Sequence, residues 1–399
     1  SNMSNDTQPE IRFPGFTDDW EQRKLKEFGK STGGTSIESE FVEGGKYKVI
    51  SIGSYSEQSV YTDQNIRAEL TDKTRNRVLN KGDLTMILND KTASGNIIGR
   101  VLLIDSNDSY VYNQRTERIE PDHKKYDSQF LYHMLNAPMI RSKIIKQAQG
   151  NTQIYVNWSA IGELDYLVPN LDEQREIGAF FFNLNNLITL HQRKLDLLKE
   201  TKKGFLQKMF PKNGAKVPEI RFPGFTEDWE ERRLQEVVDR YDNLRIPITA
   251  SKRVAGNTPY YGANGIQGYV EGYTHDGEFI LVAEDGANDL KNYPVQYVDG
   301  KVWVNNHAHV IQAKENLADN MFLMNAIRSI NIEPFLVGGG RAKLNADVLM
   351  KLEVIIPLKS EQQKIGNFFK QLDDTITLHQ RKLDLLKEMK KGFLQKMFV

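Results

Sequence analysis

The most extended hydrophobic pattern along the chain is a seam of apolar side chains spaced alternately four and three residues apart. One copy of the seam follows Asp172 and a second follows Ser360, where nearby acidic residues suit the start of a helix. This spacing predicts a long helix that packs against another helix, as in a coiled coil. At about 1.5 Å per residue, each helix would span roughly 50 Å. The predicted helix-pair core consists of Ile177, Phe181, Leu184, Ile188, His191, Leu195, Leu198, Ile365, Phe369, Leu372, Ile376, His379, Leu383 and Leu386.

We expect the two helices to pack antiparallel, because a twofold axis across their middles would carry one half of the chain onto the other. His191 lies near the midpoint of its helix and on the seam, so it would approach His379 at that axis. A buried pair of this kind would hold one proton comfortably near neutral pH, because like charges repel. The alternative is that both imidazoles face solvent from a slightly rotated seam.

A segment of mixed pattern precedes each long helix. Its apolar and β-branched runs predict strands, and a later amphipathic run predicts a helix. Counting back from the long helices places Gly150 and Gly338 in register, so we interpret the two segments as one fold with different loops. The predicted elements are strands 46–52, 84–88 and 97–104 and a helix 130–148 broken near Pro138, then strands 278–283, 295–298 and 302–311 and a helix 317–330.

The ends of the two halves repeat, whereas their middles do not. Residues 9–27 return at 218–236 with 15 of 19 residues the same, and residues 188–210 return at 376–398 with only Thr201 changed, to Met389. A single recent duplication would have left the middles alike as well. The repeat therefore indicates matching surfaces that hold two copies of one partner, and unlike surfaces that read two different targets.

The repeated opening motif combines a Pro-Gly turn with the acidic residues and tryptophan of Asp18-Asp19-Trp20, which suit a helix start. It is either a small packing motif anchored by Phe13, Phe16 and Trp20, or a surface for a partner. The sequence as a whole predicts an α/β (α+β) protein with two similar mixed α/β domains, separated by a pair of long antiparallel coiled-coil helices and related by pseudo-twofold symmetry. The boundaries are 1–167 for the first domain, 168–210 for the first helix, 211–217 for a polar linker, 218–355 for the second domain and 356–399 for the second helix.

Composition narrows the possible functions. Lys plus Arg equals Asp plus Glu at 53 each, so contact with a nucleic acid must depend on local patches. The chain has no cysteine, which rules out disulfides and thiolate metal sites and favours a cytoplasmic setting. We expect no membrane span and no signal peptide, since the sequence has no sufficiently long apolar run.

Motifs for catalysis are missing from the chain. There is no N-P-P-Y or D-P-P-Y sequence of the kind expected of an adenine methyltransferase, and no phosphate-loop spacing. We therefore assign no catalytic residue. His307 and His309 could share one strand face and hold a metal, but no third ligand is evident, so no metal site is predicted.

Candidate nucleic-acid contacts are basic, amide and aromatic side chains near predicted loops. Arginine pairs with guanine and asparagine with adenine, while lysine and arginine also bind phosphates. The basic run from Arg67 to Arg77 could instead be merely solvated, and Tyr260 and Tyr261 could pack within a strand and turn. The residues following Gly150 and Gly338 differ at matched positions, as two readers of different targets require. The candidates are Arg67, Lys73, Arg75, Arg77, Lys91, Gln153, Tyr155, Tyr260, Tyr261, Asn264, Asn305, Asn306, His307, Arg341 and Lys343.

Taken together, these motifs resemble the DNA specificity subunit of type I restriction-modification systems. The resemblance covers almost the whole chain. Any one of its motifs would be weak, but the repeated set is strong. It is carried by the P-E-I-R-F-P-G-F opening, Glu173-Gln174 and Glu361-Gln362, the K-L-D-L-L-K-E helices and the Tyr-Tyr-Gly-Ala-Asn-Gly run.

The resemblance implies a division of labour. Two target recognition domains would each read half of an asymmetric, bipartite double-stranded DNA target, while the two helices set the gap between the half-sites. Two methyltransferase subunits would dock on the repeated parts, and restriction motor subunits would join them. No cofactor is then expected in this chain, because S-adenosylmethionine and ATP would bind to the partners. The alternatives are a single-chain enzyme and a coiled-coil scaffold without DNA selectivity.

Overall fold

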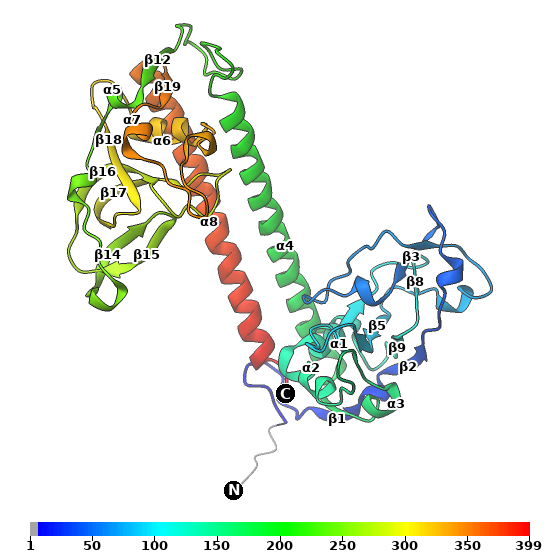
Figure 1. The fold of residues 1–399 in the computed structure, drawn as a ribbon. Coiled ribbons are helices and arrows are strands. Elements are labelled where there is room, and N and C mark those ends of the chain that lie inside the picture. Colours follow the sequence, from blue (N-terminus) through cyan, green and yellow to red (C-terminus); the bar gives the residue numbers. More distant parts are fainter. Residues whose placement is uncertain (1–6) are drawn as a thin grey trace. The chain divides into compact units, whose positions relative to one another are not determined.

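The computed structural model describes residues 7–399, which form two compact units (Figure 1). Unit 1 consists of the described residues up to His191 together with Lys382–Val399. Unit 2 consists of Gln192–Arg381. Each unit therefore contains one mixed α/β body, the beginning of one long helix and the end of the other.

Both units contain the same antiparallel arrangement of four strands. The order in unit 1 is β2-β9-β5-β7, and β13-β18-β16-β17 in unit 2 occupies the corresponding positions. The prediction that the two middles share one fold is therefore confirmed for this core. The strands are β2 (Gly29–Gly33), β9 (Thr116–Pro121), β5 (Leu84–Ile87) and β7 (Val101–Leu103), and β13 (Val238–Arg240), β18 (Ala308–Ala313), β16 (His275–Ala283) and β17 (Val295–Val304).

The units differ in what is added to this core. Unit 1 carries a separate three-stranded sheet of order β4-β3-β8, whereas β17 of unit 2 pairs in parallel with β14, which forms a hairpin with β15. One predicted break in unit 2 is misplaced. β17 continues through Gly300, which pairs with Gly277 of β16, and the chain turns only at residues 305–307. The added strands are β3 (Tyr47–Ile50), β4 (Arg67–Ala68), β8 (Tyr110–Tyr112), β14 (Ala255–Gly262) and β15 (Gly265–Val270).

The helices that follow the core sheets begin alike. Asp127 accepts a hydrogen bond from the backbone N–H of Phe130, and Asp319 accepts one from that of Phe322, so both helices have an aspartate N-cap. The predicted break at Pro138 is confirmed, because a second helix starts at that residue. The helices are α1 (Ser128–Asn136), α2 (Pro138–Ile145) and α6 (Asn320–Arg328), and shorter helices are α3 (Trp158–Ile161), α5 (Leu234–Val237) and α7 (Ala346–Met350).

The opening motifs continue into strands, which corrects the predicted helix starts. β1 (Glu21–Lys24) pairs with β11 (Asp165–Val168), and β12 (Glu230–Arg233) pairs with β19 (Glu353–Ile356). The preceding tryptophan is buried in each copy, with its ring centroid 6.0 Å from that of Phe130 in unit 1. Burial of this ring and pairing with a distant strand outweigh the local preference for a helix. The tryptophan of the opening motif is therefore a packing residue, as the first of the two interpretations predicted.

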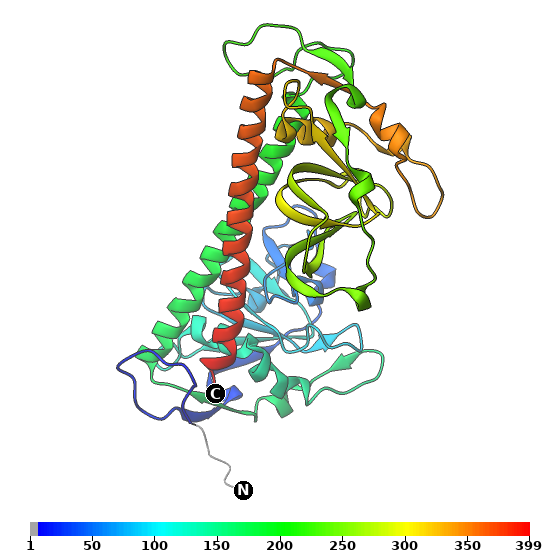
Figure 2. The same ribbon diagram turned by 90° about the vertical axis from the view of Figure 1, so that its left-hand side faces the viewer.

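The two long helices begin close to the predicted residues. They are α4 (Leu171–Lys208) and α8 (Lys359–Lys396), and at about 1.5 Å per residue each is about 57 Å long (Figures 1 and 2). All fourteen predicted helix-pair core residues are buried or half-buried. None of the helices among residues 7–399 is long and apolar enough to cross a membrane.

Within each unit, the beginning of one long helix packs against the end of the other. In unit 1 the ring centroids of Phe180 and Phe393 are 5.1 Å apart, and in unit 2 those of Phe205 and Phe368 are 5.0 Å apart. The helix segments of each unit are therefore antiparallel, as predicted. His191 belongs to unit 1 and His379 to unit 2, so their approach stays a prediction.

Candidate nucleic-acid interface

A joint of three side chains fixes the α/β body of unit 1 on its long helix. The Arg12 guanidinium donates two hydrogen bonds of 2.8 Å to Glu173, whose side chain is fully buried. The next residue, Gln174, accepts from the backbone N–H of Asp127 at 3.0 Å and donates to the carbonyls of Lys125 and Pro169. This contact joins the first turn of α4 to the cap of α1.

Unit 2 repeats the joint bond for bond. Arg221 donates to Glu361, while Gln362 accepts from the N–H of Asp319 and donates to the carbonyls of Leu317 and Pro357. Next to this contact, a Cβ at Gly366 would lie 2.7 Å from Asp319 Oδ2. The Glu-Gln pair, which the sequence analysis gave as a motif of the family resemblance, is therefore the contact that joins each body to its long helix.

At another edge of each body lies a short hairpin of the same geometry. In hairpin 1 (Gln149–Tyr155) the two end residues exchange backbone hydrogen bonds of 2.9 and 3.0 Å, and in hairpin 2 (Val337–Lys343) they exchange bonds of 2.9 and 2.8 Å. Gly150 and Gly338 both have φ of +95°, a value that favours glycine. The predicted register of these two glycines is confirmed.

Hairpin 1 brings three predicted contact residues together. Its strand β10 (Ile154–Tyr155) pairs with β6 (Asn89–Asp90), so exposed Gln153 and Tyr155 lie near Lys91, the residue that follows β6. The buried Asp90 carboxylate accepts from the backbone N–H groups of Thr92 and Ile97 and shapes the loop between them. The result is an exposed edge with an amide, an aromatic ring and a cation.

Hairpin 2 lies against a set of charged and amide groups. Asp285 contacts His307 Nδ1 at 2.5 Å through one oxygen and Arg341 Nε at 3.3 Å through the other. Asn264 holds the adjoining loop, because its amide donates to the carbonyl of Gly286 and its oxygen accepts from the N–H of Asn288. The fold therefore gathers Asn264, His307 and Arg341, which are far apart in sequence.

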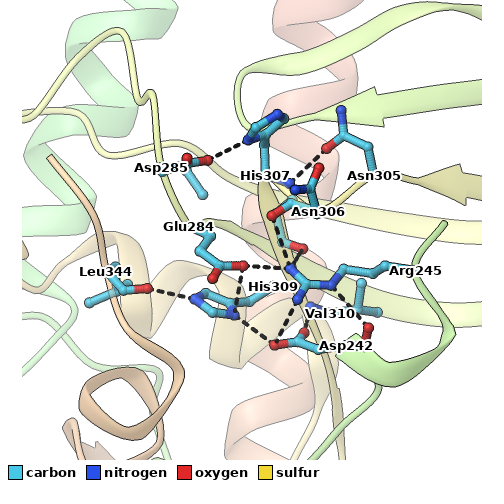
Figure 3. A network of polar contacts seen from close by, with 12 residues as sticks. Asp242, Arg245, Glu284, Asp285, Asn305, Asn306, His307, His309, Val310 and Leu344 are labelled. Carbon is cyan, nitrogen blue, oxygen red and sulfur yellow. Dashed lines mark hydrogen bonds and ion pairs between the residues drawn. The ribbon is translucent and has the colours of Figure 1, made fainter. Parts of the chain in front are cut away.

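A buried ionic network that the sequence did not reveal lies beneath hairpin 2 (Figure 3). The His309 ring is fully buried, with Nδ1 2.7 Å from Asp242 and Nε2 2.7 Å from the carbonyl of Leu344, the residue after the hairpin. Glu284 accepts from Arg245 at 2.6 Å, and its backbone carbonyl accepts from the N–H of Leu344. Both nitrogens of the His309 ring thus face oxygen acceptors. Burial raises the pKa of Asp242, but the hydrogen bonds from His309 and Val310 outweigh it, so the pKa lies below its usual value.

Unit 2 also contains a cleft of about 920 Å³ between α4 and the loops beside hairpin 2. Lys199, Lys202 and Lys203 of α4 line it together with the asparagines Asn264, Asn288 and Asn292. Lys202 is 2.6 Å from Asp373, whereas Lys199 and Lys203 are exposed. Lysines across from amide groups suit contact with phosphates. Sequence reasoning missed these lysines because they belong to the repeated helix, which was interpreted through its apolar seam.

Comparison with known proteins identifies the family. The sequence profile described as "Type I restriction modification DNA specificity domain" matches residues 17–200 and 226–388. The chain belongs to this family. The structure is also similar to that of the S subunit of a type I restriction-modification system from M. genitalium, with a TM-score of 0.72 and 16% identity over 98% of this chain and 99% of that one, which shows a shared fold.

Two relatives of this specificity-domain protein are themselves named type I restriction enzyme specificity subunits. One, from Haemophilus influenzae, is 47% identical over 154 residues, and the other, from Methanocaldococcus jannaschii, is 27% identical over 190 residues. These matches span 39% and 47% of this chain and 39% and 44% of the two relatives. The matched part is thus less than half of each relative's length.

Two predicted contacts in unit 2 are corrected by burial. Tyr260 is 1% exposed, its hydroxyl donates to the carbonyl of Ile248, and Arg253 covers its ring at 4.0 Å. Asn305 is 4% exposed and accepts from the N–H of His307. Both side chains shape the fold and cannot reach a base. Tyr261 is half-buried against a second apolar cluster, whereas Asn306 is exposed at the turn.

The basic run of unit 1 has acidic and aromatic neighbours, and its contact with phosphates stays a prediction. Arg67 is on β4 and donates at 2.8 and 2.7 Å to the Asp63 carboxylate, whose pKa it holds far below the usual value. The other three cations are also engaged. Lys73 lies 3.9 Å from Glu40, Arg75 lies 3.5 Å from Asp72, and Arg77 lies over the ring of Tyr112 at 5.4 Å.

The two histidines considered for a metal are separated by their surroundings. His307 lies at the turn beside Asp285, whereas His309 is enclosed on β18. Among residues 7–399 no group of three or more histidine, aspartate or glutamate side chains is arranged to hold a metal ion.

Proposed function

We propose that this chain reads DNA sequence for a type I restriction-modification complex, with each unit recognising one half of an asymmetric, bipartite target. The observation that carries the proposal is the pair of hairpins. They have one backbone geometry and one attachment to the core, yet Gln153 and Tyr155 occupy the positions that Arg341 and Lys343 occupy in the other unit. Equal scaffolds with unequal side chains suit two readers of different sequences, because bases are distinguished by side-chain contacts at their edges.

We further propose that two methyltransferase subunits dock on the repeated long helices, and that restriction motor subunits join that assembly. The helices carry exposed leucines at identical repeat positions outside the buried seam. Leu190 is 63% exposed and its counterpart Leu378 52%, while Leu197 is 62% exposed and Leu385 61%. Exposed apolar residues at matched sites in two copies fit two copies of one apolar partner surface.

In this proposal, chemistry belongs to the partners. S-adenosylmethionine and ATP would bind to the methyltransferase and motor subunits, while this chain is not itself an enzyme and holds no cofactor. Its action is placed in the cytoplasm. The near-neutral charge fits a reader that relies on partner subunits for much of the phosphate attraction.

The long helices would set the gap between the half-sites. Sites read from one face of a duplex lie about one helical turn apart, near 34 Å, and each helix is long enough to span this distance. Inserting one heptad into both helices should widen the recognised gap while leaving both half-sites unchanged. An unchanged gap would contradict this role.

The central test is methylation mapping in a host that lacks the modification. The chain is expressed with the methyltransferase subunits of the same system, and methylated adenines are located across the genome. A single bipartite motif is expected, and it should vanish without this chain. Methylation that lacks any motif would favour the alternative, a coiled-coil scaffold without DNA selectivity.

The docking surface is tested in the same host with Leu190→Glu and Leu378→Glu together. This double variant should lose co-purification with the methyltransferase subunits and lose methylation. The matched control is Val60→Glu, which changes an exposed apolar residue of similar accessibility, 58%, away from the helices. If the wild type, the double leucine variant and Val60→Glu co-purify equally with the methyltransferase subunits, the helices are not the docking surface.

A further inference from the structure

The Arg341 side chain is exposed but not loosely placed. Its side chain is 61% exposed, near the tip of hairpin 2, where a Cβ added at Gly339 or Gly340 would meet no atom within 4 Å. Yet its Nε lies 3.3 Å from Asp285 Oδ2, and its Nη2 lies 3.3 Å from His307 Nδ1. Because this side chain is already held at its base, it loses less conformational entropy when it binds a ligand.

The partners of Asp285 fix which edge of the guanidinium is available. Asp285 Oδ1 accepts from His307 Nδ1 at 2.5 Å, so the carboxylate is held in place from a second direction. With Nε turned to the carboxylate and Nη2 3.3 Å from His307 Nδ1, Nη1 and the outward N–H of Nη2 are the donors left for a ligand. Two parallel N–H donors match a ligand that offers two acceptors side by side.

We propose that Arg341 reads a guanine in the half-site recognised by unit 2, with Asp285 as the residue that positions it. This inference rests on the proposed function. In the major groove, guanine presents the O6 and N7 acceptors that a guanidinium binds with two hydrogen bonds. The major groove admits an element as wide as a two-stranded ribbon, and hairpin 2 is a narrow turn closed by one antiparallel pair, Val337 with Lys343, with a tip free of side chains.

Local charge separates a base contact from a phosphate contact. Asp285 and Glu284 lie beside the hairpin, and Glu284 is 3.6 Å from Lys343. These carboxylates repel a phosphate but not the neutral acceptors on a base edge. Exposed Lys199 and Lys203 of the α4 cleft, whose lining also includes Glu200 and Asp289, offer contacts for the phosphate backbone.

The test compares methylation motifs made by the full complex carrying the wild-type chain, Arg341→Ala, Arg341→Lys or Lys351→Met. The wild type should give a motif with a G·C pair in one half-site. Both Arg341 variants should make that one position degenerate and leave the other half-site intact, because lysine keeps the charge but lacks the fork. Lys351→Met, which removes an exposed cation of unit 2 outside hairpin 2, should retain the base identity.

Binding measurements separate reading from folding. With duplexes that carry each of the four base pairs at the assigned position, the wild-type complex should prefer one by about 10- to 100-fold, as expected for one bidentate contact. Arg341→Ala should bind all four within about twofold, and Asp285→Asn should fall between the two. A thermal melt equal to that of the wild type shows that the variants are folded.

The outcomes distinguish this inference from the proposed function. If the wild-type complex methylates without any motif, the proposed function fails. If it gives a bipartite motif but Arg341→Ala keeps the same bases, or loses affinity equally for all four duplexes, the guanine contact is wrong while the proposed function stands. A Gln153→Ala variant assigns the half-sites, because it should alter only the half read by unit 1.

Discussion

Hairpin 1 and hairpin 2 have the same backbone but are supported differently. Ile154 of hairpin 1 packs with Leu88 against the apolar core of unit 1, whereas hairpin 2 leads into Leu344, whose carbonyl is 2.7 Å from the enclosed His309. An apolar support fixes depth but tolerates small rotations, since it has no preferred direction. A hydrogen-bonded ionic support fixes direction as well. The same loop can thus be made adaptable or rigid by the residues beneath it.

The difference reaches the underlying strands. Glu117 of β9 pairs with Met86, and His309 of β18 pairs with Val282, so the two residues occupy corresponding positions. Burial raises the pKa of Glu117 to about 7, with Arg77 opposing the shift. Unit 1 therefore has at this position a carboxyl group whose charged form is disfavoured by burial. Unit 2 has there a histidine whose two ring nitrogens face oxygen acceptors.

The largest expected change in the free energy of unfolding comes from replacing His309, and the corresponding replacement of Glu117 should not match it. Replacing His309 with Leu removes its buried hydrogen bonds to the Asp242 carboxylate and the Leu344 carbonyl, and two such unsatisfied acceptors should lower the free energy of unfolding by about 4 kcal/mol. Replacing Glu117 with Leu should be neutral or stabilising, because a buried carboxyl is removed. Denaturant unfolding followed by circular dichroism measures both, and similar losses in the two variants would refute the contrast.

A smaller loss should be equal in both units, because the joint at the start of each long helix is the same. Arg12→Met and Arg221→Met each leave a buried glutamate unpaired and should each cost about 3 kcal/mol. Arg232→Met, which removes an exposed pair with Glu230, should cost less than about 1 kcal/mol. Unequal losses for Arg12 and Arg221, measured as shifts of the unfolding midpoint, would show that the joints differ in strength.

A third effect is a pH dependence belonging to unit 1. Because the folded pKa of Glu117 is raised from 4.5 to about 7, its contribution is fully present below pH 4.5 and is lost as the pH rises to about 7. The loss should be on the order of 2–3 kcal/mol. Glu117→Gln should abolish this slope, whereas Glu43→Gln, at an exposed site, should keep it. An identical slope in the wild type and Glu117→Gln, from unfolding at a series of pH values, would reject the assignment.

The smallest effect on stability should accompany a large effect on recognition. Tyr155 is 39% exposed, so Tyr155→Ala should change the free energy of unfolding by less than about 0.5 kcal/mol. The methylation motif should nevertheless change in the half-site opposite to the one that Arg341 affects. A motif that stays intact in both halves would remove Tyr155 from the interface.

The sequence predicted the repeated architecture well because periodic burial leaves a direct trace in it. The helix seam, the break at Pro138 and the register of Gly150 with Gly338 all follow from local spacing or backbone preference. The helix expected after Asp18 was wrong because pairing of β1 with β11, a contact between distant segments, decides its conformation.

The candidate interface was harder to predict for the same reason. Asn264, Asp285 and Arg341 become neighbours only through strand pairing, and no spacing in the sequence announces it. Tyr260 and Asn305 have side chains suited to bases but are buried. The polar character of a residue does not tell whether its side chain faces a ligand or forms hydrogen bonds with the backbone. The histidines of the His307-Ala308-His309 run were recognisable in the sequence as an unusual pair.

The joint between Arg12, Glu173 and Gln174 has an evolutionary consequence. Its bonds are made by side chains of the repeated motifs and by backbone groups, and none involves a residue of either hairpin. One whole α/β body can therefore be exchanged, or a hairpin tip mutated, without changing the hydrogen bonds that join a body to its long helix. Under the proposed function, such a change would alter the recognised target and leave the repeated helix surfaces unchanged.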